Sequence, residues 1–262
     1  MGKFDRILLV SDWDGTLFWD GKLPENNLTA IRRFQENGGL FTFASGRMYS
    51  FLRSYRDLIR PNTYVLACNG AMIYDLEERL VYDGVCDDRL YDLIDRAFAL
   101  DVGYHSVLLY MADNPVEDGH EIYTKEEYLA NRASFCGRPA HKAVMITTDS
   151  ASGLLGSQLM NGFDLGEYFA VRSWGMSLEF MKEKNGKGAS LRRIKQLSGA
   201  RLAIAVGDYE NDLSMLRAAD ISYAPANALD AVKQTVDRVT VHCKDGSIAA
   251  IIEDLERECG AF

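Results

Sequence analysis

The chain has 262 residues, of which 47% are apolar and 26% charged, a composition typical of a folded protein with one core or two unequal domains. Its formal net charge of −9, without a concentrated basic segment, argues against nucleic acid as a partner. Five cysteines without Cys-x-x-Cys spacing, no signal-peptide pattern and no apolar run of membrane-spanning length predict a cytoplasmic protein that does not enter a membrane.

Strands and helices alternate in the first part of the chain. Short apolar runs predict buried strands at residues 7–10, 40–44 and 64–67. Apolar residues at helical spacing between them predict one helix that ends at Gly38-Gly39 and another over 48–59 that stops before Pro61. This order predicts a parallel sheet with right-handed crossovers.

The middle of the chain has a different rhythm, with a helix predicted at 88–100 and strands at 106–111, 143–147 and 177–181. The first rhythm then resumes. Helices are predicted at 187–197, 212–219 and 247–258, and strands at 202–206, 221–224 and 239–241. The pattern indicates a second α+β domain inserted into the first.

Two carboxylates follow the first predicted strand, in Asp12-Trp13-Asp14-Gly15-Thr16. Ligands of open α/β sheets bind beyond the carboxyl ends of the strands. Side chains two positions apart on an extended chain point the same way, and two close anions favour a shared cation. Gly15 allows a sharp turn. The segment also fits an ordinary turn at a strand end, where Asp and Gly are common.

A second acidic segment, Gly207-Asp208-Tyr209-Glu210-Asn211-Asp212, follows the strand predicted at 202–206. Asp208 occupies the place after its strand that Asp12 occupies after the first. If the two strands are neighbours, the two carboxylates converge, and such oxygen ligands suit Mg²⁺. Asn211 or Asp212 also fits as a helix cap, which accounts for one polar residue but not for the cluster.

Two further segments offer groups that bind anions. In Ala44-Ser45-Gly46-Arg47, at the end of the second strand, a hydroxyl and main-chain N–H groups suit a phosphate oxygen. Lys187 lies near a predicted helix start, where a positive charge opposes the helix dipole and so favours a nearby phosphate or carboxylate. Ser45 fits equally well as a helix N-cap and Lys187 as a solvated lysine, with the lysines at 182 and 184 competing for its role.

Together and in this order, the four segments resemble the motifs of the haloacid dehalogenase superfamily, and most closely its Cof-like phosphatases. The resemblance includes Asn69-Gly70-Ala71 and the tail from Met215 through Asn227 to Asp245-Gly246, and it extends over nearly the whole chain. It implies a Rossmann-like core, residues 1–82 and 185–262. An α+β cap domain for substrate selection, residues 83–184, is then inserted after the third strand.

The resemblance also implies a Mg²⁺-dependent phosphatase of small phosphorylated metabolites, such as sugar phosphates, that works through an aspartyl-phosphate. Asp12 is then the nucleophile and Asp14 the general acid and base. Mg²⁺ is held by the carboxylates of Asp12 and Asp208 and by the main-chain carbonyl of Asp14. The residues implied to bind the phosphoryl group are Ser45, Gly46, Lys187 and Asn211, and Asp212 orients Lys187 or a metal-bound water.

The physics of phosphoryl transfer agrees with these roles, because a carboxylate can attack a phosphate dianion only when positive charge masks their repulsion. Other functions remain open. A sugar phosphomutase of the same superfamily would return the phosphoryl group to the substrate. A receiver domain shares the acidic pocket and lysine but is much shorter, and a non-catalytic phosphate-binding protein would not need the complete set. The chain is expected to be a monomer or a weak homodimer.

Three aromatic residues near the predicted nucleophile have no assigned role. Trp13 stands where the family usually has a smaller apolar residue, and we expect it to pack in the core because its strand position points away from the acids. Phe18 and Trp19 belong to a segment that forms a flap near the site entrance in the family. We expect packing for both, with stacking on a sugar or an aromatic leaving group as the alternative.

Overall fold

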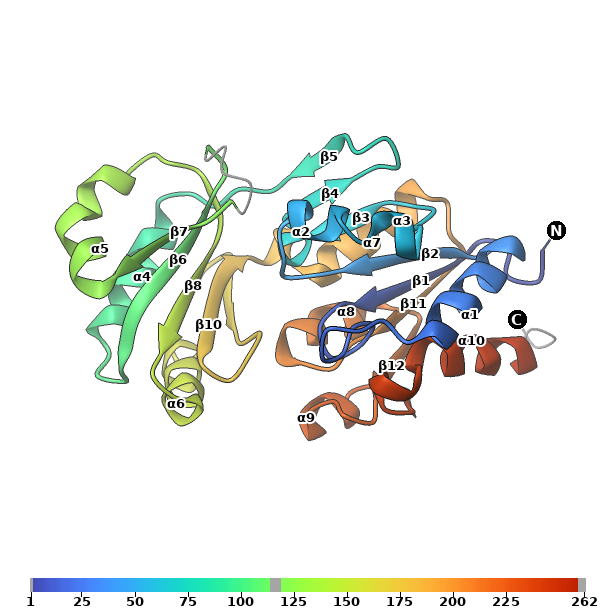
Figure 1. Ribbon diagram of the computed structural model, residues 1–262. Coiled ribbons are helices and arrows are strands. Elements are labelled where there is room, and N and C mark those ends of the chain that lie inside the picture. The colour runs from blue at the N-terminus through green and yellow to red at the C-terminus, as the bar shows by residue number, and fades with distance from the viewer. Residues whose placement is uncertain (1, 114–118, 259–262) are drawn as a thin grey trace. The chain divides into compact units, whose positions relative to one another are not determined.

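The computed structural model, shown in Figure 1, describes residues 2–113 and 119–258. The chain forms two compact units, one from Met1–Tyr82 with Lys187–Phe262 and one from Asp83–Gly186. We call them the core unit and the inserted unit, because the second interrupts the first in sequence. Their elements confirm the predicted fold class, an α/β core with a parallel sheet and an inserted α+β unit.

In the described part of the core unit, eight strands form one sheet in the order β13-β12-β11-β1-β2-β3-β4-β5. β1 (Ile7–Asp12) lies in the middle and pairs in parallel with β11 (Leu202–Val206) and β2 (Leu40–Ala44). Every residue of β1 is buried, as expected for a strand covered on both faces. The other strands that pair in parallel are β3 (Val65–Ala67), β12 (Ile221–Pro225) and β13 (Arg238–Thr240).

The sequence does not predict the two strands at one edge of this sheet. β4 (Met72–Tyr74) runs antiparallel to β3, and β5 (Leu80–Asp83) lies beside β4. Three residues are too few to show a period, and β5 is mostly exposed, so neither strand leaves a hydrophobic pattern. The inserted unit therefore begins at Asp83, the last residue of β5.

Helices of the core unit pack on its sheet in pairs. α7 (Lys187–Leu197) and α8 (Leu213–Ala218) pack against each other and share a buried cluster with Leu8 and Val10 of β1. α1 (Glu25–Glu36) and α10 (Ser247–Glu258) form the other pair, with α1 against β2. The remaining helices are α2 (Tyr49–Arg53), α3 (Arg56–Ile59) and α9 (Asp230–Lys233).

The single helix predicted over 48–59 is wrong. The chain turns at Ser54 and Tyr55, which divides this segment into α2 and α3. The ring of Tyr55 packs there against Trp13, with the ring centroids 4.9 Å apart. Tertiary packing of an aromatic side chain thus accompanies a break that the apolar spacing does not show.

The described part of the inserted unit contains a five-stranded sheet in the order β7-β6-β8-β10-β9. Its helices pack against the sheet around one buried apolar cluster. The predicted helix and three strands are present, whereas β7, β9, α5 and α6 are not predicted from the sequence. The strands are β6 (Tyr104–Met111), β7 (Glu121–Thr124), β8 (Ala140–Thr147), β9 (Tyr168–Val171) and β10 (Ser177–Lys182), and the helices are α4 (Arg89–Ala99), α5 (Lys125–Asn131) and α6 (Ser150–Met160).

Helix length bears on the relation to membranes. A bilayer requires about 20 consecutive apolar helical residues, and α1 and α10 have 12 residues each. Within residues 2–113 and 119–258, no helix combines the length and apolar character needed to cross a membrane.

Candidate active site

Strand order brings the predicted site segments to one edge of the core sheet. β1 and β11 are parallel neighbours, so Asp12 at the end of β1 and Asp208 just beyond β11 lie at the same edge. Asp12 is also in register with Ala44 of β2, so Ser45 follows at that edge. The condition for convergence, that the two acid-bearing strands be neighbours, is therefore fulfilled.

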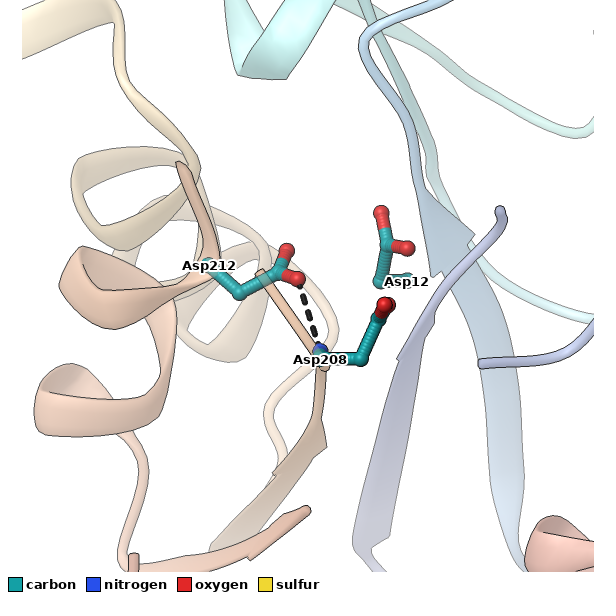
Figure 2. A group of neighbouring side chains, drawn as sticks. All are labelled: Asp12, Asp208 and Asp212. Carbon is teal, nitrogen blue, oxygen red and sulfur yellow. Dashed lines mark hydrogen bonds between the residues drawn. The ribbon is translucent and has the colours of Figure 1, made fainter. Parts of the chain in front are cut away.

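Three carboxylates meet at this edge. Asp12, Asp208 and Asp212 each offer an oxygen, and these oxygens lie within 4.8 Å of one another. Figure 2 shows the three side chains, with the carboxylates of Asp12 and Asp208 close together and that of Asp212 turned toward them. The expected metal set consisted of Asp12, Asp14 and Asp208, and the geometry adds the side chain of Asp212 to the oxygens available there.

Lys187 lies beside this group, at the first turn of α7. Asp12 continues the face of β1 that presents Leu8 and Val10, and α7 packs on that face, so the start of the helix lies close to Asp12. The Lys187 ammonium is buried and donates to Oδ1 of Asp12 and, at 2.7 Å, to Oδ1 of Asp212. The solvated-lysine alternative is therefore wrong for Lys187.

Asp212 is held on both of its oxygens. Oδ1 accepts from Lys187, and Oδ2 accepts from the main-chain N–H groups of Asp208 at 2.9 Å and Tyr209 at 3.1 Å. The dashed line in Figure 2 marks the bond to Asp208. Because the residue is fully buried, this carboxylate fixes both the lysine and the loop that carries Asp208.

The loop after β1 closes around Asp208. Thr16 donates from Oγ1 to Oδ1 of Asp208 at 2.7 Å. Gly15 has φ +80°, and a Cβ atom on it would lie 2.3 Å from Oδ2 of Asp208, so only glycine fits this approach. Asn227 donates to the carbonyl of Gly15 at 2.7 Å and holds the loop from the other side. These residues lie in the two acidic segments and in the tail that includes Asn227, but the sequence does not indicate that they contact one another.

The carboxylate of Asp14 lies outside this group. β1 ends at Asp12 and the chain then turns, so the extended geometry that would align the two acids does not continue. Asp14 instead accepts two hydrogen bonds from Arg47, both at 2.8 Å, and the side chains of both residues are about half exposed. The Arg47 guanidinium also stacks on Phe51, 4.1 Å from its ring centroid. Arg47 follows Ser45 and Gly46 in the sequence, but its type and position alone indicate no role for it.

Ser45, Gly46 and Asn211 are connected through Asn69. The Ser45 carbonyl accepts from the main-chain N–H of Asn69 at 2.7 Å, and Asn211 donates to Oδ1 of Asn69 at 3.3 Å. A Cβ atom on Gly46 would lie 3.2 Å from the same oxygen. Asn69 has φ 56°, a left-handed conformation that Asn adopts more readily than most residues. Ser45 also accepts from the Arg47 N–H at 3.2 Å, as a cap would.

The aromatic residues after the first strand pack as expected, with one exception. Trp13 is fully buried and stacks on Phe18 at 5.5 Å, beside Phe43 at 5.2 Å. Phe18 also contacts Tyr55. Trp19 is 40% exposed and packs edge-on against His242. The packing expected for Trp13 and Phe18 is confirmed, whereas Trp19 keeps a large exposed surface.

Burial and the short distances between the charged groups shift the pKa values in this cluster. Burial raises the pKa of Asp12 well above its ordinary value, and the charge of Asp212 raises it further, against the Lys187 ammonium. Burial and the charge of Asp212 raise the pKa of Asp208 to about 7, although the Thr16 hydrogen bond opposes the shift. Burial opposes the charge of Lys187, but the carboxylates of Asp12 and Asp212 outweigh it and hold its pKa above the ordinary value.

The donor set fits a divalent cation. Three ionised carboxylates and one ammonium give −3 and +1, a net charge of −2, which one divalent ion balances. The raised pKa values of Asp12 and Asp208 indicate that Lys187 alone does not supply enough positive charge. All the offered ligands are hard oxygens, the type that Mg²⁺ prefers.

Comparisons with known proteins show which family and which folds this chain is similar to. A family model described as haloacid dehalogenase-like hydrolase matches residues 9–252. The 5-amino-6-(5-phospho-D-ribitylamino)uracil phosphatase YitU of Bacillus subtilis is 24% identical over 264 residues, which cover 94% of this chain and 96% of that protein.

Two solved structures show the same fold over nearly their whole length. A HAD/COF-like hydrolase from Plasmodium vivax superposes with a TM-score of 0.76 at 19% identity, covering 98% of this chain and 96% of that one. The HAD subclass IIB sugar phosphatase BT4131 superposes with a TM-score of 0.73 at 18% identity, covering 95% of this chain and 98% of that one.

Proposed function

Because this chain belongs to the haloacid dehalogenase-like hydrolase family and is a phosphatase of that family, we propose that it hydrolyses sugar phosphates or similar small phosphate monoesters through an aspartyl-phosphate on Asp12. Family membership argues against the receiver-domain alternative. One observation supports the proposal above the others: acids from β1, the loop after β11 and the start of α8 meet around one buried lysine.

Two displacements make up the proposed reaction. A carboxylate oxygen of Asp12 attacks phosphorus while the bond from phosphorus to the leaving oxygen breaks, and Asp14 gives that oxygen a proton. Water then attacks the aspartyl-phosphate, its proton passes to Asp14, and the bond from Asp12 to phosphorus breaks. Inorganic phosphate leaves, and both carboxylates return to their starting state.

Positive charge and hydrogen-bond donors support the role of Asp12. Lys187 contacts its carboxylate directly and reduces its repulsion of a phosphate dianion. Ser45 and Asn211, which are connected through Asn69, are proposed to donate to the phosphate oxygens, with Gly46 allowing their close approach. Asp212 has the supporting role of holding Lys187 in place.

Arg47 controls the availability of Asp14 in this proposal. Its two hydrogen bonds occupy both carboxylate oxygens of Asp14, so a leaving group or a water molecule can reach Asp14 only when Arg47 moves away. The first displacement needs a protonated Asp14 at the leaving oxygen, so Asp14 has to exchange Arg47 for the substrate. Both side chains are partly exposed, which allows such an exchange.

Asp12 and Asp208, with the main-chain carbonyl of Asp14, are the proposed ligands of Mg²⁺, and Asp212 lies close enough to contribute. When bound, the ion supplies positive charge that reduces repulsion between the substrate phosphate and the carboxylates. The acidic cluster supports this assignment because its net charge of −2 matches one divalent ion.

The substrate class is proposed from the named relatives. YitU is named for a ribityl phosphate and BT4131 is titled a sugar phosphatase, and both match nearly the whole of this chain. In both names the phosphate is carried by a sugar or a sugar alcohol. We assign the choice among such esters to the inserted segment 83–184, because the residues around Asp12 contact the phosphate, which all of these substrates share.

A panel of phosphate esters tests the function. Phosphate release should be measured for p-nitrophenyl phosphate, hexose and pentose phosphates and 5-amino-6-(5-phospho-D-ribitylamino)uracil, with Mg²⁺ and with EDTA. We expect Mg²⁺-dependent release from at least one sugar or sugar-alcohol phosphate. An isomeric sugar phosphate without release of phosphate would instead indicate a phosphomutase, and no turnover of any ester would contradict the enzyme assignment.

Asp12→Asn tests the nucleophile. It should fold like the wild-type chain and lose turnover by several orders of magnitude, because an amide does not replace the attacking carboxylate. Asp57→Asn, at an exposed position on α3, is the matched control and should keep full activity. Near wild-type turnover in Asp12→Asn would disprove the assignment of the nucleophile.

A further inference from the structure

Helix α6 of the inserted unit directs three small residues and Met160 inward and three leucines outward. Gly153, Gly156 and Ser157 are buried against the sheet. Leu154, Leu155 and Leu159 on the same helix are 41–47% exposed. An ordinary surface helix has the reverse arrangement, with its apolar stripe toward the core. The outer face of α6 is therefore apolar without contributing to the core of this unit.

The glycines are required by the packing of α6 and do not merely weaken the helix. A Cβ atom on Gly153 would lie 2.2 Å from the carbonyl oxygen of Gly175, and one on Gly156 would lie 2.1 Å from the Tyr104 hydroxyl oxygen. A Cβ atom on Gly175 would in turn lie 2.3 Å from Oγ of Ser150. Because the loop at Gly175 is this close to α6, its exposed neighbours Trp174 and Met176 flank the helix.

The exposed apolar side chains of α6 and of the segments next to it are together called the α6 surface. Residues 150–163 contain no Asp, Glu, Lys or Arg, so the helix carries no charge of its own. The aromatic ring of Phe163, just after the helix, is 40% exposed and lies under the Arg96 guanidinium, 4.7 Å from its centroid. The α6 surface consists of Leu154, Leu155, Leu159, Phe163, Trp174 and Met176, which are 39–47% exposed.

The size of the α6 surface matches the apolar part of a standard protein interface. Aromatic side chains offer roughly 150–250 Å² each, and leucine and methionine are smaller, so six such side chains at about two-fifths exposure present on the order of 400 Å². A stable interface buries about 800 Å² per partner, of which about 60% is apolar, or roughly 480 Å². Apolar patches of this size on a monomer often mark an interaction site.

We propose that the α6 surface is the contact of a homodimer, in which α6 pairs with α6 of a second copy across a two-fold axis. A two-fold contact brings the same patch together from both sides, so the outward leucines of a helix without charged residues are complementary to their own copies. An anionic membrane or a charged partner would favour basic or acidic side chains on the helix, and residues 150–163 have none.

Charge substitutions at Leu155, the most exposed of the three leucines on α6, test the proposal. Leu155→Glu and Leu155→Lys each bring two like charges together in a two-fold dimer and should raise its Kd by about 100-fold or more. A one-to-one mixture of the two variants pairs opposite charges and should restore dimers. Leu129→Glu, at a similarly exposed leucine on α5, is the matched control and should associate like the wild type.

Molar mass should be measured by light scattering on the eluting full-length protein over loading concentrations of about 1–100 µM. We expect the wild-type chain and the control to approach twice 29.3 kDa and each single variant to remain at 29.3 kDa with unchanged circular dichroism. The mixture should dimerise. A monomeric wild type, dimers that survive both single variants, or a mixture that stays monomeric would overturn the proposal. Wild-type monomers that sediment with phosphatidylcholine vesicles would assign the surface to lipid and overturn it as well.

Discussion

Alanine in place of Gly15 should displace the carboxylate of Asp208. Gly15 has φ +80°, a backbone conformation that costs an L residue about 1–2 kcal/mol. Its Cβ atom would lie 2.3 Å from Oδ2 of Asp208, whereas ordinary contact begins at 3.4 Å. The carboxylate therefore has to move by roughly 1 Å, and a misplacement of that size lowers reaction rates by about 100-fold. We expect kcat/KM to fall by that factor and the Mg²⁺ requirement to rise.

Gly199→Ala separates the clash from the backbone strain. Gly199 also has a left-handed conformation, φ +66°, but a Cβ atom there meets nothing within 4 Å. Both variants should lose about 1–2 kcal/mol of unfolding free energy in urea denaturation, and only Gly15→Ala should lose turnover. The two measurements together distinguish an unstable enzyme from a misplaced carboxylate. If Gly15→Ala turned over within a few-fold of the Gly199→Ala rate, the contact between Gly15 and Asp208 would have no part in catalysis.

Three further predictions concern charge. The pKa of Asp208 is raised to about 7 from 3.8, so its contribution to stability is present below the lower value and is lost as the pH rises through the higher one. Mg²⁺ has to displace the proton that Asp208 carries below this pKa. The increase in melting temperature on adding Mg²⁺ should therefore grow between about pH 5.5 and pH 8. An increase that does not change with pH would contradict the assignment of Asp208 as a ligand. Lys187 and two main-chain N–H groups donate to the two carboxylate oxygens of Asp212, whereas an asparagine side chain offers only one oxygen as an acceptor. Asp212→Asn should therefore lower the unfolding free energy by about 1.5–3 kcal/mol in urea denaturation. Lys142→Met removes the ammonium that the buried Glu179 contacts at 2.8 Å and should lower the unfolding free energy by about 3–5 kcal/mol. The double variant with Glu179→Leu leaves no buried charge unpaired and should regain most of this loss. Equal stability of the single and double variants would refute that reasoning.

Much of the candidate site can be predicted from the sequence because parallel strands place their carboxyl ends at one edge of a sheet. Asp12, Ser45 and Asp208 each follow a buried strand, and residue type and position alone indicate that they lie close together. The sequence does not show how the cluster is held. Lys187 and Asp12 are 175 residues apart, and their contact depends on which face of β1 is covered by α7.

Apolar periods and residue types suffice to predict most of the buried strands, an inserted second unit and the functional groups of the site, because burial leaves a period in the apolar residues and chemistry requires particular side chains. Which charges meet depends on how distant segments pack, as in the pairs of Asp212 with Lys187 and of Asp14 with Arg47. Tertiary packing also decides that α6 presents leucines outward, since glycines allow a close approach that an apolar period does not reveal. The physical reason is the same in each case: local patterns record whether a residue is buried, and distant packing selects its partner.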